Sequence, residues 1–577
     1  MHTFKVWAPI PKQVELHLGG RRLPMATRPD GWWTAEASSA VPGTDYGFIL
    51  DGQGPFPDPR SPWQPAGVHS LSRRIDHSAF NWTDATFMAP PLASAVIYEL
   101  HPGTFTTEGT FTAAIDKLDH LVGLGISHVE LMPVAAFPGD YGWGYDGVSL
   151  YAPHAAYGSP DDLKRLVNAC HTRGLAVLLD VVYNHLGPSG NYLARYGPYF
   201  TSRYSTPWGS ALNYDDAGSD EVRRFFCDNA LMWLRDYHFD GLRLDAIHAI
   251  VDLSAFPFLE QLTGEVRQLA ARLGRPLVLI AESDLNAPRV VLDTDHGGYG
   301  FDAQWSDDFH HALHAVLTGE KNGYYADFGS LADLAKALQH AFVRDGRYSI
   351  YRRCRVGRPP LGLTGGRFLA YLQNHDQVGN RARGERSSRL MSLCRLKIGA
   401  TLVLTSPFVP LLFQGEEWGA TTPFLYFADH QEPGLVKAVR EGRRREFAAF
   451  GWNPRDLPDP CSAGTFRRSK LDWSEPGRAP HRDLLDWHRS LLRLRRAEPD
   501  LAPCPLGRVN VFYDEQSGWL SLERGRITVV SNFGARLQVV PVRPGTHQAL
   551  LVSDAEIRIS PSSVTLPPEA VAVLKAP

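Results

Sequence analysis

The sequence contains no stretch of about 20 uncharged apolar residues, which is the length that a membrane-spanning helix needs. Its first residues, MHTFKV, do not combine a charged segment with a following apolar one, so no secretory signal is predicted and a cytoplasmic location is expected. Long runs of one charge are also absent, because 59 Lys and Arg are scattered among 62 Asp and Glu, for a net charge of −3. Neither nucleic acid nor an anionic membrane is therefore expected as a partner.

Cysteine is scarce, and none of the six residues has the CxxC spacing of a metal or redox site. One of them falls on the apolar stripe of a predicted helix, where a thiol behaves as a small hydrophobic side chain. We therefore expect buried, reduced thiols and no disulfide framework. The six are Cys170, Cys227, Cys354, Cys394, Cys461 and Cys504.

The length and composition indicate a globular protein of several domains. A single hydrophobic core stops growing near about 250–300 residues, so 577 residues predict one large domain with smaller attachments. The hydrophobic share of 44% and the charged share of 21% are ordinary for globular proteins. The 14 Trp and 21 Tyr weakly suggest a sugar ligand, although core packing explains most aromatic residues.

The pattern along the chain divides it into three parts. Residues 1–88 carry short alternating runs such as FKVW and VELHL between turns, which predicts an N-terminal β-sandwich that ends at a proline-containing linker. Residues 89–485 alternate apolar runs with amphipathic helices. Residues 486–577 include most of a predicted helix at 484–496 and return to short alternating strands at 509–573, which predicts a C-terminal helix and β-sandwich.

The middle part predicts an α/β fold. Runs such as LAVLLDVV at 175–182 are typical of strands buried on both faces of a parallel sheet, and the preceding helix begins with Ser159 as N-cap and Asp162 three residues later. Eight strand–helix units predict a closed (β/α)8 TIM barrel, flanked by the two β-sandwiches. The eight candidate strands lie near Val96, Val129, Leu175, Leu242, Leu277, Phe301, Phe368 and Val409.

Polar residues close four of these runs, at the strand ends where barrel enzymes place their active sites. Side chains alternate along a strand, so Arg243 and Asp245 point into the barrel mouth, and the arginine keeps the carboxylate ionised, as a nucleophile requires. Glu282 ends the next strand, where a neighbouring carboxylate raises its pKa, as a general acid requires. Two such carboxyl groups about 5–5.5 Å apart suffice for retaining cleavage of a glycoside.

Each of these residues, taken alone, also has a structural explanation that competes with the catalytic one, because an Asp at a strand end is often the N-cap of the following helix. The set is harder to explain in this way. Three carboxylates, one arginine and two histidines end four strands on one face of the predicted barrel, which favours a catalytic site. For Cys170 and Trp233 we expect core packing only.

Four short motifs carry a resemblance to a known family. DVVYNH at 180–185, GLRLDA at 241–246, the AES around Glu282 and QNHDQ at 373–377 resemble, in order, the motifs of the α-amylase family, glycoside hydrolase family 13. The resemblance covers essentially the whole chain. It implies that Asp245 is the nucleophile, Glu282 the acid/base and Asp376 a third carboxylate that grips the sugar. It also implies sugar contacts by Tyr145, His185, Arg243, Leu244, Ala246 and His375.

Other stretches narrow the resemblance. The N-terminal part, ending in DPRSPWQPAGVH, is similar to the carbohydrate-binding module that precedes the barrel in isoamylases, branching enzymes and trehalohydrolases. WSDDFHHALH, QNHDQVGNRARGER and GEEWGATTPFLYFADH look like the trehalohydrolase branch, although Gln414 stands where Met is expected. This branch implies hydrolysis of the α-1,4 bond between a maltooligosaccharide and its terminal trehalose, on the product of a maltooligosyltrehalose synthase. Residues implied on the trehalose side are His248, Asp307, Asp308, Phe309, His310, His311, Gln377, Asn380 and Arg381.

Two other functions stay open at this point. A branching or debranching enzyme shares the module and the barrel but acts on α-1,6 bonds. A non-catalytic glucan-binding protein would not need the three carboxylates together. Asn184 matches a position that helps to ligate calcium in many amylases, but no acidic cluster completes a site, so we predict no metal and no cofactor.

Overall fold

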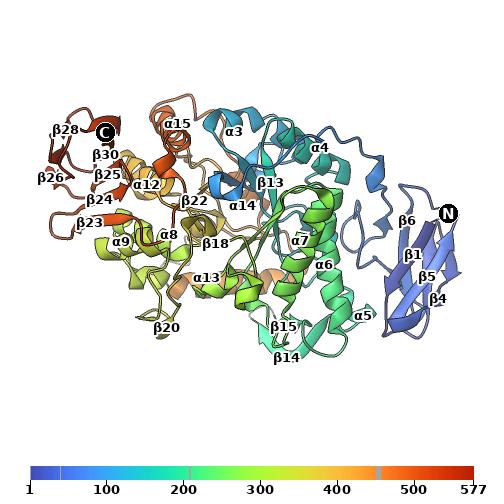
Figure 1. The fold of residues 1–577 in the computed structure, drawn as a ribbon. Coiled ribbons are helices and arrows are strands. Elements are labelled where there is room, and N and C mark those ends of the chain that lie inside the picture. Colours follow the sequence, from blue (N-terminus) through green and yellow to red (C-terminus); the bar gives the residue numbers. More distant parts are fainter. Residues whose placement is uncertain (1, 39, 207–208, 450–456, 577) are drawn as a thin grey trace.

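The computed structural model describes the chain except for residues 1, 39, 207–208, 450–456 and 577. Figure 1 shows three consecutive parts: an N-terminal β module at one end, a helix-surrounded barrel in the middle, and a C-terminal β part at the other end. The predicted fold class is confirmed.

The barrel consists of eight parallel strands, and each lies close to one of the eight predicted positions. Phe301 precedes its strand by two residues. The order around the closed barrel is β9 (Ile97–Leu100), β10 (His128–Leu131), β13 (Ala176–Val181), β16 (Gly241–Leu244), β17 (Val278–Ala281), β18 (Ala303–Trp305), β21 (Phe368–Ala370) and β22 (Val409–Phe413).

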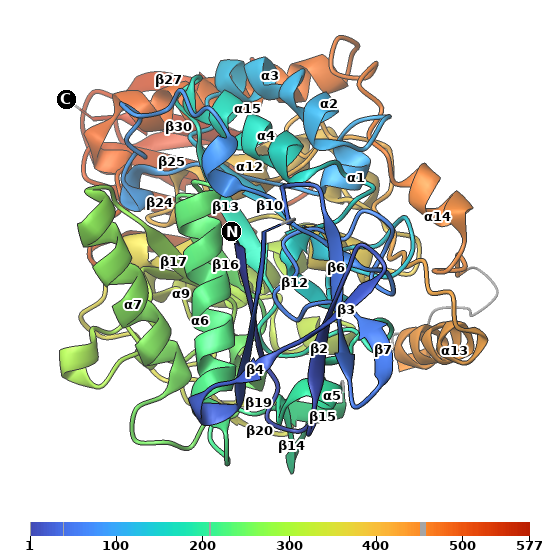
Figure 2. The ribbon, with the colours of Figure 1, turned by 90° about the vertical axis from the view of Figure 1, so that its right-hand side faces the viewer.

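Helices cover the barrel strands from outside. Helix α4 (Pro160–His171) begins with the predicted capping box, in which Ser159 and Asp162 bond each other's backbone N–H. Helix α13 (Pro433–Ala449) follows the last strand and lies away from the helical ring in Figure 2. The other main helices are α3 (Leu118–Leu124), α6 (Ser219–Asp236), α7 (Phe258–Leu273), α8 (Asp307–Thr318), α9 (Leu331–His340), α12 (Leu393–Thr405), α14 (Ala463–Arg468) and α15 (His481–Ala497).

Two antiparallel sheets form each terminal part. The N-terminal sheets are β1 (His2–Trp7), β5 (Trp32–Ala37) and β4 (Ala26–Thr27), and β3 (Arg21–Pro24), β2 (Val14–Leu18), β6 (Asp45–Leu50) and β7 (Gln53–Phe56), with β8 (Ser72–Arg73) beside β6. The C-terminal sheets are β23 (Asn510–Asp514), β24 (Trp519–Arg524), β25 (Ile527–Asn532), β30 (Val571–Lys575) and β27 (Gln548–Val552), and β26 (Gln538–Pro541), β29 (Ser563–Leu566) and β28 (Arg558–Ile559).

Hydrophobic packing runs through all three parts. One cluster of buried side chains extends from Phe4 in β1 to Val573 in β30. Trp233 is buried in it, as predicted. The expectation of buried thiols is right for Cys170 and Cys227 but wrong for the other four cysteines, which lie in loops or at the surface and are partly or fully exposed, although all six are free.

Within the described residues, no helix is both long enough and apolar enough to cross a membrane. Two short hairpins, β14–β15 (Phe200–Thr206, Gly209–Leu212) and β19–β20 (Arg347–Ser349, Cys354–Val356), lie along the lower side of the molecule in Figure 1, as does helix α13.

Candidate active site

A groove of about 900 Å³ opens at the carboxyl ends of the barrel strands. Its walls come from the segments that follow β10, β13, β16, β17, β21 and β22, together with the β14–β15 hairpin and one face of α13. The structure brings nine of the predicted residues together on these walls. They are Tyr145, His185, Asp245, Ala246, His248, Glu282, His375, Asp376 and Asn380.

Arg243 lies buried beneath the groove and connects its acidic side chains. Its Nη1 lies 3.2 Å from an oxygen of Asp245, and its Nη2 lies 2.8 Å from an oxygen of Glu282. Nη1 also donates a 2.7 Å hydrogen bond to Asp180, and the guanidinium carbon lies 4.1 Å from the ring centre of Trp305. Because one planar guanidinium reaches both Asp245 and Glu282, the two carboxyl groups lie close together on one side of the barrel mouth.

Alternation along β16 places Asp245 in the groove. Leu244 is fully buried in the hydrophobic cluster on the opposite face of the strand, so it does not line the groove as the motif had implied. Asn184 donates hydrogen bonds of 2.6 Å to a carboxylate oxygen of Asp245 and 2.8 Å to its carbonyl. These bonds and the ion pair with Arg243 hold the carboxylate toward the groove.

The backbone turns sharply after Asp245. Ala246 has a φ of 38°, in the left-handed region that costs an L-residue about 1–2 kcal/mol. The turn directs the N–H of Ala246 at Glu282, to which it donates a 2.8 Å hydrogen bond. The strained turn thus links the segment after Asp245 to the second carboxyl group.

The environment of Glu282 favours its protonated form. Burial raises the pKa of this carboxyl group, the Arg243 guanidinium opposes the rise, and the charge of Asp245 adds to it. A carboxylic acid with a raised pKa keeps its proton to a higher pH and can donate it to a leaving group.

A chain of hydrogen bonds supports the floor of the groove. The hydroxyl of Tyr145 donates to Asp180 over 2.6 Å and lies 2.8 Å from Nε2 of His375. Glu99, at the end of β9, accepts from the N–H of His375 over 2.9 Å and from its Nδ1 over 2.5 Å. Burial alone would lower the pKa of His375, but the charge of Glu99 raises it to about 9, so the imidazole is protonated.

Asp376 stands beside this chain on the short helix α10 (His375–Gly379), which Asn374 caps. Its side chain is 36% exposed toward the groove. Asn380, one turn later, donates a 3.1 Å hydrogen bond from Nδ2 to Asp376.

Two further histidines line the groove. Burial lowers the pKa of His185 to about 4, so its imidazole is neutral, and its Nδ1 contacts Asn184. His248 is partly exposed, and its Nε2 lies 3.7 Å from Asp284. A neutral imidazole can both donate and accept hydrogen bonds with sugar hydroxyls, and the exposed part of His248 is accessible to such hydroxyls.

The residues of helix α8 that were predicted to contact trehalose do not line the groove. Asp308 is fully buried and accepts bonds from the guanidinium of Arg344, at 2.6 and 2.9 Å, and from the N–H groups of Val343 and Arg344. The prediction that Asp308 binds sugar is not supported by this position, because both of its oxygens already accept bonds from the fold.

The neighbours of Asp308 also belong to the interior. His310 lies between the carbonyl of Leu372 and the hydroxyl of Tyr325, at 2.8 and 2.9 Å. Phe309 packs on Phe408, and His311 packs on Tyr324 and Phe328. Asp307 accepts a hydrogen bond from the hydroxyl of Tyr371. Gln377 is partly buried within α10. Arg381 forms an ion pair with Glu320 at 2.7 Å. The roles predicted for these residues stay predictions, and the contacts favour structural ones.

Four residues that contact the site received no role in it from the sequence. Asp180 lies at the end of one of the four selected runs, and Glu99 lies near the end of β9, where the same rule could have found it. Asn184 was considered only as a calcium ligand, yet it holds Asp245. Arg443 lies on α13, far from any strand end, and no signal in the sequence points to it. In the part of the chain that the structure describes, no group of three or more His, Cys, Asp or Glu could hold a metal.

Comparison with known proteins places the chain among carbohydrate-cleaving enzymes. The model of the alpha amylase catalytic domain matches residues 77–207, and a domain of unknown function matches residues 504–573. A malto-oligosyltrehalose trehalohydrolase from Rhizobium sp. (strain M-11) is 50% identical over 99% of this chain and 97% of its own, and one from Arthrobacter ramosus is 49% identical over 99% of both. A solved structure from Salmonella typhimurium, named as an alpha amylase, superposes with a TM-score of 0.91 at 38% identity over 99% of this chain and 97% of its own.

Proposed function

The chain belongs to the malto-oligosyltrehalose trehalohydrolases of the α-amylase family, and from this we propose that it is a retaining glycoside hydrolase that releases trehalose from maltooligosyltrehalose. The bond cleaved is the α-1,4 bond between the terminal trehalose and the rest of the chain, which leaves as a maltooligosaccharide. The observation that carries the chemistry is one guanidinium, of Arg243, in contact with both Asp245 and Glu282.

The two carboxyl groups divide the reaction between them. Asp245 attacks the anomeric carbon of the glucose in subsite −1, and the protonated Glu282 gives its proton to the glycosidic oxygen as trehalose departs. The glucosyl unit is then bonded to Asp245. The Glu282 carboxylate takes a proton from water, whose oxygen displaces Asp245 and regenerates both groups. Two inversions restore the α configuration.

The other groove residues hold the sugar of subsite −1. Asp376 accepts bonds from sugar hydroxyls, and His185, Tyr145 and the protonated His375 complete the polar wall. Positioning of this kind lowers the barrier when the contacts are stronger in the transition state than in the ground state.

On the leaving-group side we propose His248 as the contact with trehalose. Two predicted trehalose-side residues line the groove, His248 and Asn380. His248 is the one that follows the nucleophile in the chain, and its side chain is 28% exposed. The minus subsites meet the same glucose units in every α-1,4-glucan, so selectivity for trehalose depends on the plus side. The substrate would be supplied by a maltooligosyltrehalose synthase.

One assay tests the proposed function. Maltotriosyltrehalose is incubated with the protein, and products are identified by chromatography, with amylopectin as the parallel substrate. We expect trehalose and maltotriose from the first and almost nothing from the second. Debranching of amylopectin would instead favour an enzyme of α-1,6 bonds.

The stereochemistry and the two carboxyl groups are tested with the same substrate. Proton NMR in the first minutes should show the α-anomer of maltotriose, and a β-anomer would mean an inverting mechanism. The variants Asp245→Ala and Glu282→Gln should each keep less than about a hundredth of the wild-type rate with unchanged unfolding temperatures. Faster turnover by either variant would refute its role.

A further inference from the structure

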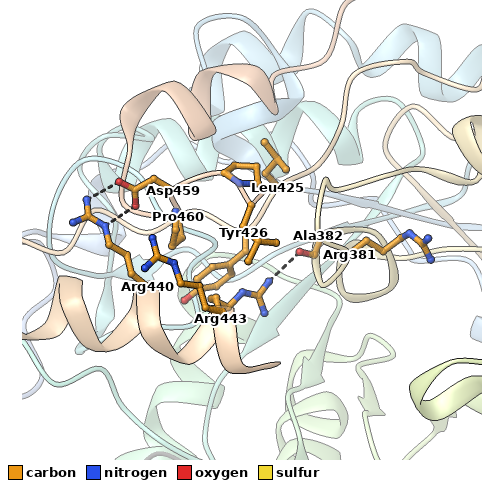
Figure 3. A pocket seen from close by; sticks show the side chains of 12 residues that line it. Arg381, Ala382, Leu425, Tyr426, Arg440, Arg443, Asp459 and Pro460 are labelled. Carbon is orange, nitrogen blue, oxygen red and sulfur yellow. Dashed lines mark hydrogen bonds and ion pairs between the residues drawn. The ribbon is translucent and has the colours of Figure 1, made fainter. Parts of the chain in front are cut away.

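Helix α13 reaches the groove from outside the barrel. Leu435, Ala438, Val439 and Arg443 line the groove. The neighbouring side of the same helix, with Arg440 and again Arg443, lines a separate pocket of about 310 Å³. Arg443 is therefore part of the wall between the two cavities. Figure 3 shows its side chain between Tyr426 and the loop that carries Arg381 and Ala382.

Within the described residues, three contacts hold the guanidinium of Arg443. The guanidinium carbon lies 4.4 Å from the ring centre of Tyr426. Nη2 donates a 3.1 Å hydrogen bond to the carbonyl of Gly379, and Nη1 donates a 2.9 Å hydrogen bond to Oδ1 of Asn380. The planar group is thus held on one face by an aromatic ring and at its edge by two acceptors.

Asn380 joins Arg443 to the predicted third carboxylate. The Nδ2 of this amide donates to Oδ1 of Asp376 over 3.1 Å. An amide has one donating end and one accepting end, whereas a guanidinium only donates. With Arg443 bound to Oδ1, the NH₂ group of Asn380 must face Asp376. If the guanidinium were removed, the amide could turn over and set its oxygen against the carboxylate.

We propose that Arg443 is a positioning residue that fixes the amide orientation of Asn380 and thereby holds Asp376 against the sugar in subsite −1. The inference rests on the proposed function, because it concerns the role given there to Asp376. It also assigns Asn380 to the support of Asp376 rather than to trehalose. An element that follows the last barrel strand thus controls a carboxylate at the end of β21.

The first test compares two variants on one helix. Arg443→Met removes the guanidinium but keeps an apolar stem over Tyr426. We expect kcat on maltotriosyltrehalose to fall roughly tenfold or more while KM changes less than about threefold, because the misplaced Asp376 acts mainly in the transition state. The matched control is Arg440→Met, one turn earlier, whose partner is Asp459 at 2.5 Å outside the groove. It should stay within about twofold of wild type.

A double-mutant cycle distinguishes a relay from Arg443 through Asn380 to Asp376 from a general effect of α13. If Arg443 acts through Asn380, then Arg443→Met added to Asn380→Ala should slow the enzyme by no more than a further twofold or so. Effects that multiply, or a loss in Arg443→Met no larger than in Arg440→Met, would overturn the proposal. Unfolding temperatures of all variants are measured alongside.

Chemical rescue gives a second readout that a purely structural role would not produce. In Arg443→Ala the vacated space adjoins the 310 Å³ pocket, which can admit a small cation. Guanidinium at low millimolar concentration should raise kcat in Arg443→Ala but not in Arg443→Ala combined with Asn380→Ala, with sodium chloride as the ionic control. Equal rescue in both backgrounds, or none in either, would contradict the relay.

These experiments distinguish a failure of the relay, in which Arg443 acts on Asp376 through Asn380, from a failure of the proposed substrate. If the wild-type protein does not cleave maltotriosyltrehalose, the proposed substrate fails. The cycle is then run on α-maltotriosyl fluoride, which requires the subsite −1 groups but no trehalose. If the wild-type protein cleaves maltotriosyltrehalose and the effects of the two substitutions on the rate multiply, only the relay fails.

Discussion

At the scale of single residues, Glu282 should set the alkaline limb of the pH–rate profile. Burial raises the pKa of its carboxyl group and Asp245 adds to the rise, whereas Arg243 opposes it. Since only the protonated form of Glu282 can donate a proton to the departing sugar, kcat falls as the pH rises through this pKa. We expect that fall at a higher pH than about 4.3, the ordinary value for Glu.

The measurement is kcat against pH on two substrates. With maltotriosyltrehalose the alkaline limb should be present in the wild-type enzyme. With α-maltotriosyl fluoride, whose leaving group needs no proton, Glu282→Gln should still release fluoride in the first turnover, before the step in which Glu282 activates water, and that release should no longer show the limb. A limb that persists unchanged in Glu282→Gln would assign it to another group.

A second residue-scale prediction separates a specificity residue from a structural one. His248 lines the groove, so His248→Ala should lower kcat/KM on maltotriosyltrehalose by roughly ten- to a hundredfold, since a lost buried hydrogen bond costs about 1–3 kcal/mol. Plain maltooligosaccharides should lose much less. Equal losses on both substrates would mean general positioning.

The matched comparison is Asp308→Asn. Asp308 is fully buried against Arg344, so this variant leaves a buried guanidinium without its charged partner and should destabilise the fold by about 3 kcal/mol. Its selectivity between the two substrates should stay that of wild type. A changed selectivity with an unchanged unfolding temperature would restore the sugar contact that the sequence predicted for Asp308.

These residues also show what sequence reasoning could and could not find. Polar residues that close strands were identifiable, because strand alternation and the barrel rule fix their direction. Asp308 belongs to a helix that begins directly after β18, where each residue turns by about 100°. The sequence does not say which turn faces the groove, and Arg344, the partner of Asp308, lies 36 positions away.

At the scale of elements, local patterns predicted strands and caps but not long-range packing. The eight strand positions and the Ser159 cap followed from apolar runs and short-range signals. Helix α13 was not predicted as a wall of the site, because its groove-facing residues Leu435, Ala438 and Val439 look like any apolar stripe. Its contacts with Gly379 and Asn380 come from tertiary packing alone.

The linker before the barrel supports an element-scale prediction about pH. Asp84 accepts bonds from His171 of α4 and from His238, each at 2.8 Å, and His171 also contacts Asp240 at 2.9 Å. Burial alone would lower the pKa of His171, but Asp240 and Asp84 raise it, and the two histidines lower the pKa of Asp84 despite its burial.

The signs of these shifts define a pH window. His171 contributes fully to the free energy of unfolding below about pH 6.5, and this contribution is lost as the pH rises through its raised pKa. Asp84 contributes to the free energy of unfolding above about pH 3.9, and this contribution is lost on acidification. The linker contact is therefore strongest between these values. His171→Gln should destabilise the protein by about 3 kcal/mol at pH 6 and flatten the pH dependence of its unfolding temperature above pH 6.5.

The control is the second histidine on the same carboxylate. His238 is 30% exposed on its side chain, whereas His171 is 1% exposed, so His238→Gln should cost clearly less. Equal losses in the two variants, or a wild-type pH slope in His171→Gln, would contradict the assignment.

At the scale of the whole molecule, the largest hydrophobic cluster runs through all three parts, and smaller clusters fill the barrel interior and the C-terminal sheets. The boundaries 1–88, 89–485 and 486–577 stay a proposal about the chain. The N-terminal module contacts α6 and the segment before β14 through polar and aromatic pairs. Trp32 donates a 3.1 Å hydrogen bond to Glu221, and Trp7 lies edge-on to Tyr199 at 5.3 Å. Parts joined in this way should unfold together.

Arg60 is the residue through which this last prediction can be tested. From the segment after β7, its Nη1 donates to the hydroxyl of Tyr151 over 2.9 Å and to Asp228 of α6 over 2.8 Å, and its guanidinium carbon lies 5.5 Å from the ring centre of Phe225. We expect one calorimetric transition for the wild-type protein. Arg60→Met should lower its midpoint, with a loss of about 2 kcal/mol from the two hydrogen bonds of the guanidinium and the ring contacts, while kcat at 25 °C stays unchanged. The transition should remain single, because the shared cluster is intact. If Arg60→Met instead splits the curve, and only an early peak moves, the module folds independently and the interface contributes little to the barrel.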